Sequence, residues 1–328
     1  MKIVFKLILF VYMSVAFLSC SSLRKATENR MLSSSVISIH QLGTETIDAP
    51  EKFERVFAIS DVHGMYLQTI SLLKAGHVID DQNNWIGGKS LLIITGDSID
   101  KGPQSIEILN LWVSLKHQSE LAGGKLIHVL GNHESEFLAD PINDKKAAEL
   151  LRELKEKNIP ISDLTSTMTE RGAFLHSEPV AARVGNWIFC HSGFYPDLSW
   201  DEFTNHSQKV LEAQDYSNDF LIGANSILEM KDWEKDSSMI QILLKRMDSM
   251  GIFGIVFGHQ PKAFNIEGRS AAKENGRLIK IDNGMPPEGG SHSGSLLVFM
   301  KPEQMNTLSY PEIKIFFTTG NSQNLIPE

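Results

Sequence analysis

The sequence has only two cysteines among its 328 residues, Cys20 and Cys190. If Cys20 serves another purpose, no intrachain disulfide can form, so the fold must rest on its core or on bound metal. The chain also lacks an excess of basic residues, because its net charge is −9 at pH 7. Proteins that bind nucleic acid usually present a basic face, so we expect no nucleic-acid partner. An acidic metal site could still hold an anionic substrate, since a bound cation reverses the local field.

The N-terminal apolar run is too short to be a full membrane span of about 20 residues. The stretch MKIVFKLILFVYMSVAFLSC has Lys2 and Lys6, then an apolar run of about twelve residues, then Ser19 and Cys20. This order is typical of a secretory signal peptide, which we predict over residues 1–20. The ending FLSC also resembles a bacterial lipoprotein box, in which Cys20 is acylated. We therefore expect an exported, membrane-anchored bacterial lipoprotein facing the periplasm or the cell surface, with simple secretion or an uncleaved anchor as alternatives.

The rest of the chain divides into three segments. Residues 21–54 are polar and rich in Ser, Thr and Glu, without a sustained period, which predicts a tether between membrane and domain. Residues 55–320 are predicted to form one domain, within which about 199–250 is a helical cap or insert beside the site. Residues 321–328 are predicted to be a C-terminal tail.

Five apolar runs in this domain are each followed at once by a polar group that can bind metal. The runs are VFAIS, LLIIT, LIHVL, WIFC and FGIVF. The polar groups that follow them are, in order, Asp61 with His63, Asp97 with Asp100, Asn132 with His133, His191, and His259. Ligands of open α/β sheets gather at the carboxyl ends of strands, so we expect these side chains to converge on one site.

The order of the predicted helices and strands indicates a mixed α/β fold. Helical patterns follow the first three runs, at about 65–75, 104–116 and 144–157. This alternation predicts βαβ units at the start of the domain. The short strands predicted at 277–282, 295–300 and 312–318 are separated by Gly and Pro turns. We expect them to pair antiparallel in a second sheet packed on the first.

The residue types of the series suit a pair of divalent metal ions. Carboxylate, amide and imidazole groups without a thiolate fit Mn, Fe, Zn, Ni or Co better than Mg. Two such ions, about 3.5–4 Å apart, hold phosphoryl oxygens and turn a bridging water into a nucleophile near neutral pH. Asp97 is central in the series and is the natural bridge. Each motif alone is common at a turn after a strand, but five in succession favour one site.

The motifs DVHG, GDSIDKGP, GNHE, CHSG and GHQP together resemble those of the calcineurin-like metallophosphoesterases. They resemble the phosphoprotein phosphatase branch most, whose pattern runs GDxHG, GDxVDRG, GNHE, HGG and GHT. The segments LHSEPVAARVGNWIFCHSGFYPDL and NGRLIKIDNGMPPEGG are similar to bacterial and Shewanella-like members. The resemblance covers about residues 55–300. It implies an α/β (α+β) fold of two packed mixed β-sheets flanked by helices, with a di-metal site at the carboxyl ends of strands.

The resemblance also implies a role for each matched residue. The first metal would be bound by Asp61, His63 and Asp97, and the second by Asp97, Asn132, His191 and His259. His133 would protonate the leaving oxygen, with Asp100 orienting it. An alkoxide leaving group needs a proton near neutral pH, and a histidine with a carboxylate partner is the usual donor.

The residues expected to bind the substrate phosphate depart from the family pattern. Lys101 stands where the family has an arginine, and Lys231 in ILEMKDW is the nearest match to a second one. Asn132 is a third candidate contact to the phosphate. Lysine keeps the positive charge but loses the planar, bidentate fork of arginine, so the choice of substrate stays open.

Together these features predict a di-metal-dependent phosphomonoesterase. The favoured substrate is a phosphoprotein or phosphopeptide carrying phospho-Ser, phospho-Thr or phospho-Tyr. One alternative is a phosphoesterase acting on nucleotides or dinucleoside polyphosphates. The other is a non-catalytic surface lipoprotein, which the intact set of ligand residues disfavours.

Overall fold

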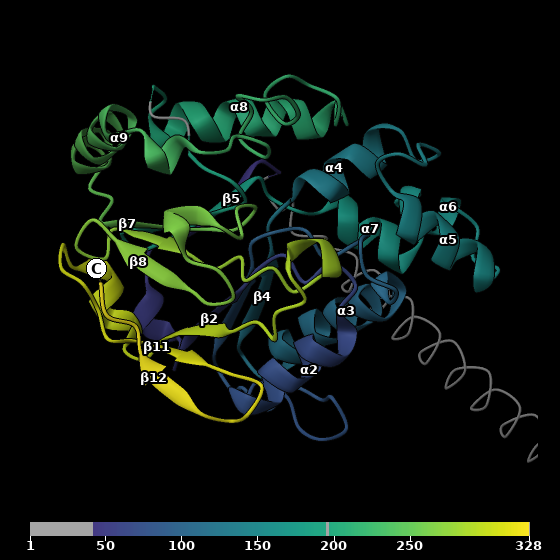
Figure 1. Ribbon diagram of the computed structural model, residues 1–328, viewed down its shortest axis with the longest axis horizontal. Coiled ribbons are helices and arrows are strands. Elements are labelled where there is room, and N and C mark those ends of the chain that lie inside the picture. The colour runs from purple at the N-terminus through teal and green to yellow at the C-terminus, as the bar shows by residue number, and fades with distance from the viewer. Residues whose placement is uncertain (1–41, 195–196, 328) are drawn as a thin grey trace, which may run out of the picture. The chain divides into compact units, whose positions relative to one another are not determined.

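The computed structural model describes residues 42–194 and 197–327, whose strands form two six-stranded sheets (Figure 1). The first sheet runs, in spatial order, β1 (Thr44–Ile47), β5 (Ala181–Val184), β6 (Trp187–Cys190), β7 (Gly254–Phe257), β9 (Leu278–Lys280) and β8 (Ala271–Lys273). The second sheet runs β12 (Ser322–Asn324), β11 (Ile313–Phe316), β10 (Leu296–Phe299), β2 (Val56–Ile59), β3 (Leu91–Ile94) and β4 (Lys125–His128). Both sheets are mixed. The pairs β2–β3, β3–β4, β6–β7, β7–β9 and β1–β5 are parallel. The pairs β5–β6, β8–β9, β2–β10, β10–β11 and β11–β12 are antiparallel.

Helices cover the outer faces of the two sheets (Figure 1). The α-helices are α2 (Tyr66–Ala75), α3 (Ser105–Leu121), α4 (Asn132–Ala139), α5 (Ala148–Glu156), α6 (Ser162–Thr165), α7 (Glu170–His176), α8 (Trp200–Glu212) and α9 (Ser237–Ser249). Short 3-10 helices lie at η1 (Pro50–Lys52), η2 (Trp233–Lys235), η3 (Ala263–Asn265), η4 (Pro287–Gly289) and η5 (Pro302–Asn306). No helix of the described residues is long and apolar enough to cross a membrane.

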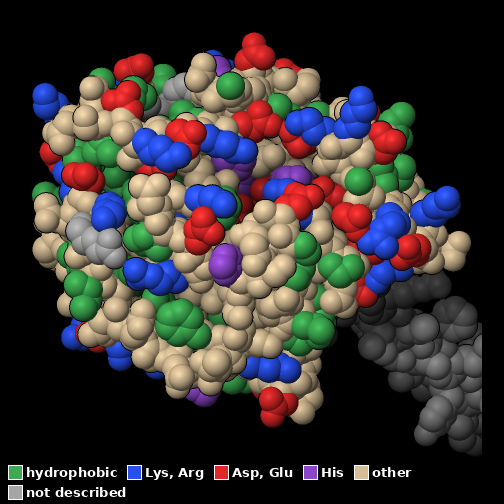
Figure 2. All heavy atoms as spheres, in the orientation of Figure 1, with side chains coloured by type: hydrophobic (Ala, Val, Ile, Leu, Met, Phe, Trp, Pro, Cys, Tyr) green, Lys and Arg blue, Asp and Glu red, His purple; other side chains and the backbone are tan. Residues whose placement is uncertain are grey.

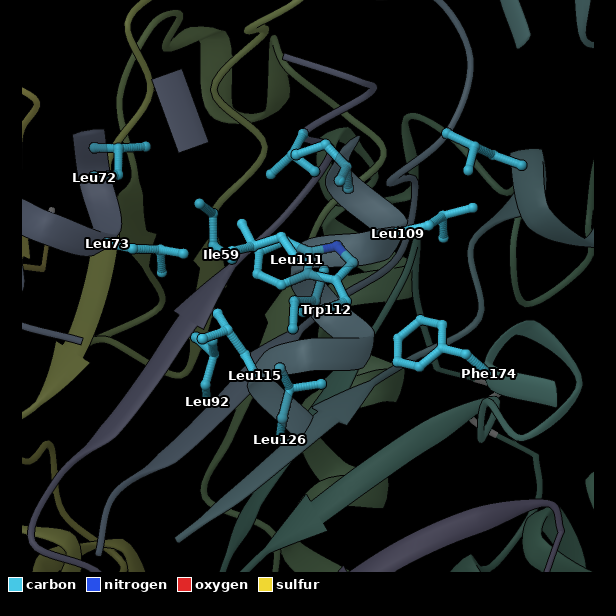
Figure 3. Packing of buried hydrophobic residues seen from close by; sticks show 14 of the residues in the cluster. Ile59, Leu72, Leu73, Leu92, Leu109, Leu111, Trp112, Leu115, Leu126 and Phe174 are labelled. Carbon is cyan, nitrogen blue, oxygen red and sulfur yellow. The ribbon is translucent and has the colours of Figure 1, made fainter. Parts of the chain in front are cut away.

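The core has three layers because successive strand residues point to opposite faces of a sheet. In β2, Val56 and Ala58 pack between the two sheets, while Phe57 and Ile59 face the helices outside. Figure 3 shows part of this outer layer, where Trp112 and Leu115 of α3 lie over Leu92 of β3. The strands are therefore apolar on both faces, which explains their continuous apolar runs in the sequence.

The strand β6 shows the same alternation in the other sheet. Trp187 and Phe189 lie in the layer between the sheets, while Ile188 and Cys190 face α8 and α9. Cys190 is a buried free cysteine, and burial raises the pKa of its thiol far above the usual value. It fills apolar space beside the ligand candidate His191.

Two sequence-based boundaries, those of the tether and the tail, are wrong in part. The predicted tether at 21–54 overlaps the fold, because β1 pairs with β5 and η1 follows it; residues 21–41 lie outside the described residues. The predicted tail at 321–328 contains β12, which pairs with β11. The cap at about 199–250 is helical only in α8, η2 and α9. β1 pairs with β5, which is distant in sequence, and β12 is a short, exposed strand of polar residues, so local composition revealed neither strand.

The separate antiparallel second sheet is also a wrong prediction. β10 and β11 do pair antiparallel, but they extend the sheet that contains β2, β3 and β4. β9 instead joins the other sheet, parallel to β7. These strands share the same local character, and only their long-range partners distinguish them.

Candidate active site

The polar residues that follow the parallel strands of both sheets meet at one edge, as the sequence predicts. Asp61, Asp97 and Asn132 follow β2, β3 and β4, while His191 and His259 follow β6 and β7. The carboxyl ends of these strands therefore supply side chains from two sheets to one place.

Asp97 lies between two histidines. Its Oδ2 is 3.4 Å from Nε2 of His63, and its Oδ1 is 3.4 Å from Nε2 of His191. Oδ1 of Asn132 lies 3.0 Å from the same nitrogen of His191. One carboxylate oxygen thus faces each imidazole, which is the arrangement that a ligand shared by two cations needs.

The two imidazoles are oriented by backbone carbonyls. Nδ1 of His63 lies 3.1 Å from the carbonyl oxygen of Ile99, and Nδ1 of His191 lies 2.8 Å from that of Thr95. A proton on each Nδ1 would be donated to these carbonyls, which leaves both Nε2 atoms free to bind metal. These partners could not be predicted from the sequence, because they are main-chain atoms.

Asp61 and His259 complete the cluster from the other strand ends. The backbone N–H of His259 donates to Oδ2 of Asp61 at 3.0 Å, and Ser60 Oγ donates to the same carboxylate oxygen. Oδ1 of Asp61 is 4.0 Å from Nε2 of His63. Burial, together with the nearby carboxylate of Asp282, raises the pKa of Asp61 well above its usual value. A buried carboxyl group is costly when ionised, so a bound cation would stabilise Asp61 as an anion.

The charge states of the histidines differ. Burial lowers the pKa of His63, and it lowers that of His259 to about 2, so both imidazoles are neutral. Burial also opposes charge on His191, but the carboxylate of Asp97 outweighs it and raises the pKa of His191 to about 9. Metal binding at His191 would therefore release a proton.

The donor set fits two divalent metal ions. Nε2 of His259 is buried and has no hydrogen-bond partner among the described residues, which is expected of a ligand atom. Ligand atoms of Asp97, His191 and His259 lie within 4.8 Å of one another, and so do those of His63, Asp97 and His133. The second group shows that His133, which the sequence suggests as a proton donor, borders the first metal position.

The backbone at the site adopts unusual φ angles that could not be predicted from the sequence. Six of the site residues have φ in the left-handed region: Asp61, His63, Asp97, Asp100, Lys101 and His259. Such conformations are costly for side-chain-bearing residues and cluster at functional sites. Glycines make room for them, because a Cβ on Gly131 would lie 2.3 Å from Oδ1 of Asp97, and one on Gly258 would lie 2.3 Å from Oδ2 of Asp61.

Glu134 is a further important residue, and sequence reasoning left it without a role although it ends the GNHE motif. Its buried carboxylate accepts hydrogen bonds from the backbone N–H groups of Asp97, Ser98, Ile99 and Gly131. It therefore ties the turn after β3 to the turn after β4. The motif showed that a glutamate follows His133, but its role could be recognised only once the two turns were known to be neighbours.

The proposed proton donor and its partner are adjacent. Nδ1 of His133 lies 3.4 Å from Oδ2 of Asp100. Oδ1 of Asp100 accepts from the N–H groups of Glu149 and Leu150, which lie in the first turn of α5. Burial works against ionisation of Asp100, but its contacts with His133 and these amides hold its pKa below the usual value. Asp100 is thus kept as an anion beside the imidazole.

The lysines expected at the phosphate line the same cavity as the catalytic candidates. This cavity of about 690 Å³ is bordered by Lys101, Lys231, Asn132, His133 and His259. Nζ of Lys101 is 3.2 Å from Nε2 of His63. Figure 2 shows histidine, lysine and acidic side chains gathered around a hollow in the face that it displays. All the predicted site residues are therefore brought together, with Lys231 placed at the cavity wall.

The site combines a cluster of carboxylates and imidazoles that can hold two metals with a nearby histidine and two lysines. These groups are suited to the hydrolysis of phosphoesters. The chain matches the calcineurin-like phosphoesterase family over residues 54–276. It therefore belongs to this family of metallophosphoesterases, which use divalent metals, and it is a phosphoester hydrolase.

Several relatives are similar to parts of the chain. Shewanella-like protein phosphatase 2 of Arabidopsis thaliana is 38% identical over 84 residues, which cover 26% of this chain and 22% of that protein. A symmetrical bis(5'-nucleosyl)-tetraphosphatase of Vibrio parahaemolyticus is 28% identical over 145 residues, or 44% of this chain and 46% of that protein. The chain thus matches less than half the length of these two relatives.

Two similarities extend over most of the chain. An uncharacterized protein of Schizosaccharomyces pombe is 21% identical over 290 residues, which cover 78% of this chain and 81% of that protein. The crystal structure of a cold-active protein-tyrosine phosphatase from a psychrophilic Shewanella species superposes with a TM-score of 0.69 at 22% identity, covering 87% of this chain and 84% of that one. This likeness confirms the predicted fold of two mixed sheets flanked by helices.

Proposed function

We propose that this hydrolase is a di-metal phosphatase that removes phosphoryl groups from phosphorylated Ser, Thr or Tyr side chains of proteins. The observation that carries the proposal is the position of Asp97 between His63 and His191, next to the His133–Asp100 pair. Two ions of Mn, Fe, Zn, Ni or Co would supply the charge that holds phosphoryl oxygens and activates water. The residues that would bind these ions are Asp61, His63, Asp97, Asn132, His191 and His259.

The other side chains of the site divide the remaining work. His133 donates a proton to the leaving oxygen, and Asp100, 3.4 Å from its Nδ1, orients the imidazole. Lys101, Lys231 and the amide of Asn132 bind the phosphate oxygens. The cavity of about 690 Å³ has room for one substrate side chain and part of its backbone.

The charges along the cavity favour a phosphorylated polypeptide over a dinucleoside polyphosphate. Four lysines and four glutamates border it: Lys101, Lys145, Lys146, Lys231, Glu136, Glu149, Glu229 and Glu288. With Lys101 and Lys231 at the reacting phosphate, further phosphates would meet mainly glutamates. The described lining residues include no Phe, Tyr or Trp on which a base could stack. A peptide with mixed charges and a single phosphate suits this lining.

The test combines metal analysis of the purified protein with a substrate panel. Initial rates are measured on phosphopeptides carrying each of the three phosphorylated residues, on a mononucleotide, and on diadenosine tetraphosphate. We expect about two metal ions per chain and the highest kcat/KM on a phosphopeptide. A higher kcat/KM on diadenosine tetraphosphate would shift the assignment to the nucleotide alternative. Bound metal without hydrolysis of any phosphoester would favour a binding module instead.

We also propose that the protein is exported and held at a bacterial membrane by a lipid on Cys20. The N-terminal residues MKIVFKLILFVYMSVAFLSC support this, since they combine basic, apolar and small-residue segments in the order of a signal peptide. In a bacterial host, the full chain should fractionate with membranes, and Cys20→Ala should move it to the soluble fraction. Equal partitioning of the two forms would refute the lipid anchor.

A further inference from the structure

The N-termini of α3 and α5 each receive a carboxylate from outside their own helix. Neither Gln104 before α3 nor Ala147 before α5 caps its helix with a side chain. The first N–H groups of a helix need partners, and buried ones are costly without them. Asp100, from the turn after β3, accepts from the N–H groups of Glu149 and Leu150 at 2.9 and 3.1 Å. The N-terminus of α5 therefore contacts Asp100, the carboxylate partner of the proposed proton donor His133.

Glu153, one turn further along α5, binds the N-terminus of α3. Its Oε2 accepts from the N–H of Ser105 at 2.7 Å, and its Oε1 accepts from the N–H of Ile106 at 3.1 Å. These are the first two residues of α3. The Glu153 side chain is buried, and Nζ of Lys157, the residue that follows α5, lies 3.3 Å from its Oε1. The N-terminus of α5 is therefore bound by the carboxylate of Asp100, which precedes α3, and the N-terminus of α3 is bound by the carboxylate of Glu153 in α5.

Ser105 closes these contacts into a ring. Its Oγ accepts from the N–H of Asp100 at 3.0 Å, while its own N–H donates to Glu153. Both the backbone and the carboxylate of Asp100 are thus fixed, one by Ser105 and the other by the first turn of α5. Asp100 has φ of 62°, a conformation that needs such support in a residue with a side chain. Within this ring, Oδ2 of Asp100 lies 3.4 Å from Nδ1 of His133.

We propose that Glu153 is a positioning residue for proton donation by His133, and that it acts through the ring Glu153–Ser105–Asp100 and the N-terminus of α5. This inference rests on the proposed function, because it assumes that His133 is the proton donor. Without the Glu153 carboxylate, α5 loses its hydrogen bonds to the first turn of α3, and the amides that hold Asp100 are fixed less firmly. A proton donor out of place slows only reactions whose leaving group needs the proton.

The experiment compares leaving groups in the intact protein. For each variant, kcat/KM is measured on a phosphoserine peptide, whose alkoxide needs a proton, and on p-nitrophenyl phosphate, whose leaving group does not. We expect Glu153→Gln to lower the ratio of the two values about tenfold with unchanged metal content. Gln keeps the shape of the side chain but offers one acceptor oxygen where Glu offers two. Glu156→Gln, exposed on the same helix, is the matched control and should leave the ratio unchanged.

The outcomes separate the inference from the function on which it rests. Equal losses on both substrates, or no loss, in Glu153→Gln would overturn the positioning role while His133→Asn still showed the selective loss. A wild-type protein inactive on every phosphoester would instead overturn the proposed function, and the inference with it. If Glu153→Gln does not fold, Ser105→Ala removes only the acceptor of the Asp100 N–H, and the same fall in the ratio is expected from it. An unchanged ratio in Ser105→Ala would then refute the ring.

Discussion

Nζ of Lys101 lies 3.2 Å from Nε2 of His63, the nitrogen that also faces the carboxylate of Asp97. The ammonium group thus reaches the edge of the first metal position from a residue whose φ is 61°. A cation at that position would repel the ammonium group, and the phosphate bound beside it would attract it. Lys101 is therefore placed to serve the substrate, although it lacks the bidentate fork of the arginine that the family motif has there.

We predict that Lys101→Ala lowers kcat/KM on a phosphopeptide by about 10- to 100-fold and leaves metal content unchanged. The loss corresponds to one hydrogen bond to a charged group, worth about 1.5–3 kcal/mol. Steady-state kinetics and metal analysis of the same preparations measure both quantities. Lys101→Arg, which keeps the charge, is the matched control and should retain most of the activity. An unchanged kcat/KM in Lys101→Ala would remove this residue from the site.

The second prediction concerns His133→Asn. We expect a loss of about 10²- to 10⁴-fold in kcat on phosphoserine peptides, because the alkoxide then leaves without a proton. The loss on p-nitrophenyl phosphate should be much smaller, since that leaving group is stable as an anion. Rates on the two substrates, measured at the same metal occupancy, provide the comparison. Equal losses would mean that His133 acts as a metal ligand, in keeping with its place beside His63 and Asp97.

Much of the site could be predicted because the relevant information is local. Each parallel strand is a short, continuous apolar run, and the polar residue after it marks the carboxyl end at which ligands gather. The sequence thus placed Asp61, Asp97 and His259 together, and the structure brings them together. The predicted helix at about 65–75 matches α2 (Tyr66–Ala75) for the same reason.

The rest depends on contacts between segments far apart in sequence. β1 completes the edge of one sheet by pairing with β5, yet its own residues are polar enough to suggest a tether. Glu134 and Glu153 act on backbone N–H groups of other segments, and such partners leave no mark in the sequence. The left-handed φ of Asp97 is likewise imposed by its surroundings, since nothing intrinsic to aspartate requires it.

The third prediction concerns Glu134→Gln. A glutamine amide group would face N–H donors that now share a carboxylate, so two of them would lose their acceptor. We expect the free energy of unfolding to fall by about 2–4 kcal/mol and metal affinity to fall by about 10- to 100-fold. Urea denaturation and metal titration measure these changes. Glu120→Gln, on the exposed side of α3, should change neither, and a normal metal affinity in Glu134→Gln would argue against the link between the two turns.

The last prediction concerns pH and the carboxyl group of Glu153. Burial, with the nearby carboxyl of Glu107, raises the pKa of Glu153 from 4.5 to about 6, although the amides of Ser105 and Ile106 act in the opposite direction. A raised pKa means that the folded protein binds this proton more tightly than the unfolded chain does. The stabilisation is therefore fully present below the unfolded pKa and is lost as pH rises through the folded one.

Relative to Glu153→Gln, which cannot ionise, the wild type should lose stability as the pH rises from about 4.5 to about 6, with little further change above that. Urea denaturation of both proteins across this range gives the difference in free energy of unfolding, in which the titration of groups that do not interact with Glu153 cancels. Glu156→Gln, at an exposed position of the same helix, serves as the control. A difference that moves in the opposite direction would show that the two amides at the start of α3 dominate over burial and hold Glu153 as an anion at all these pH values.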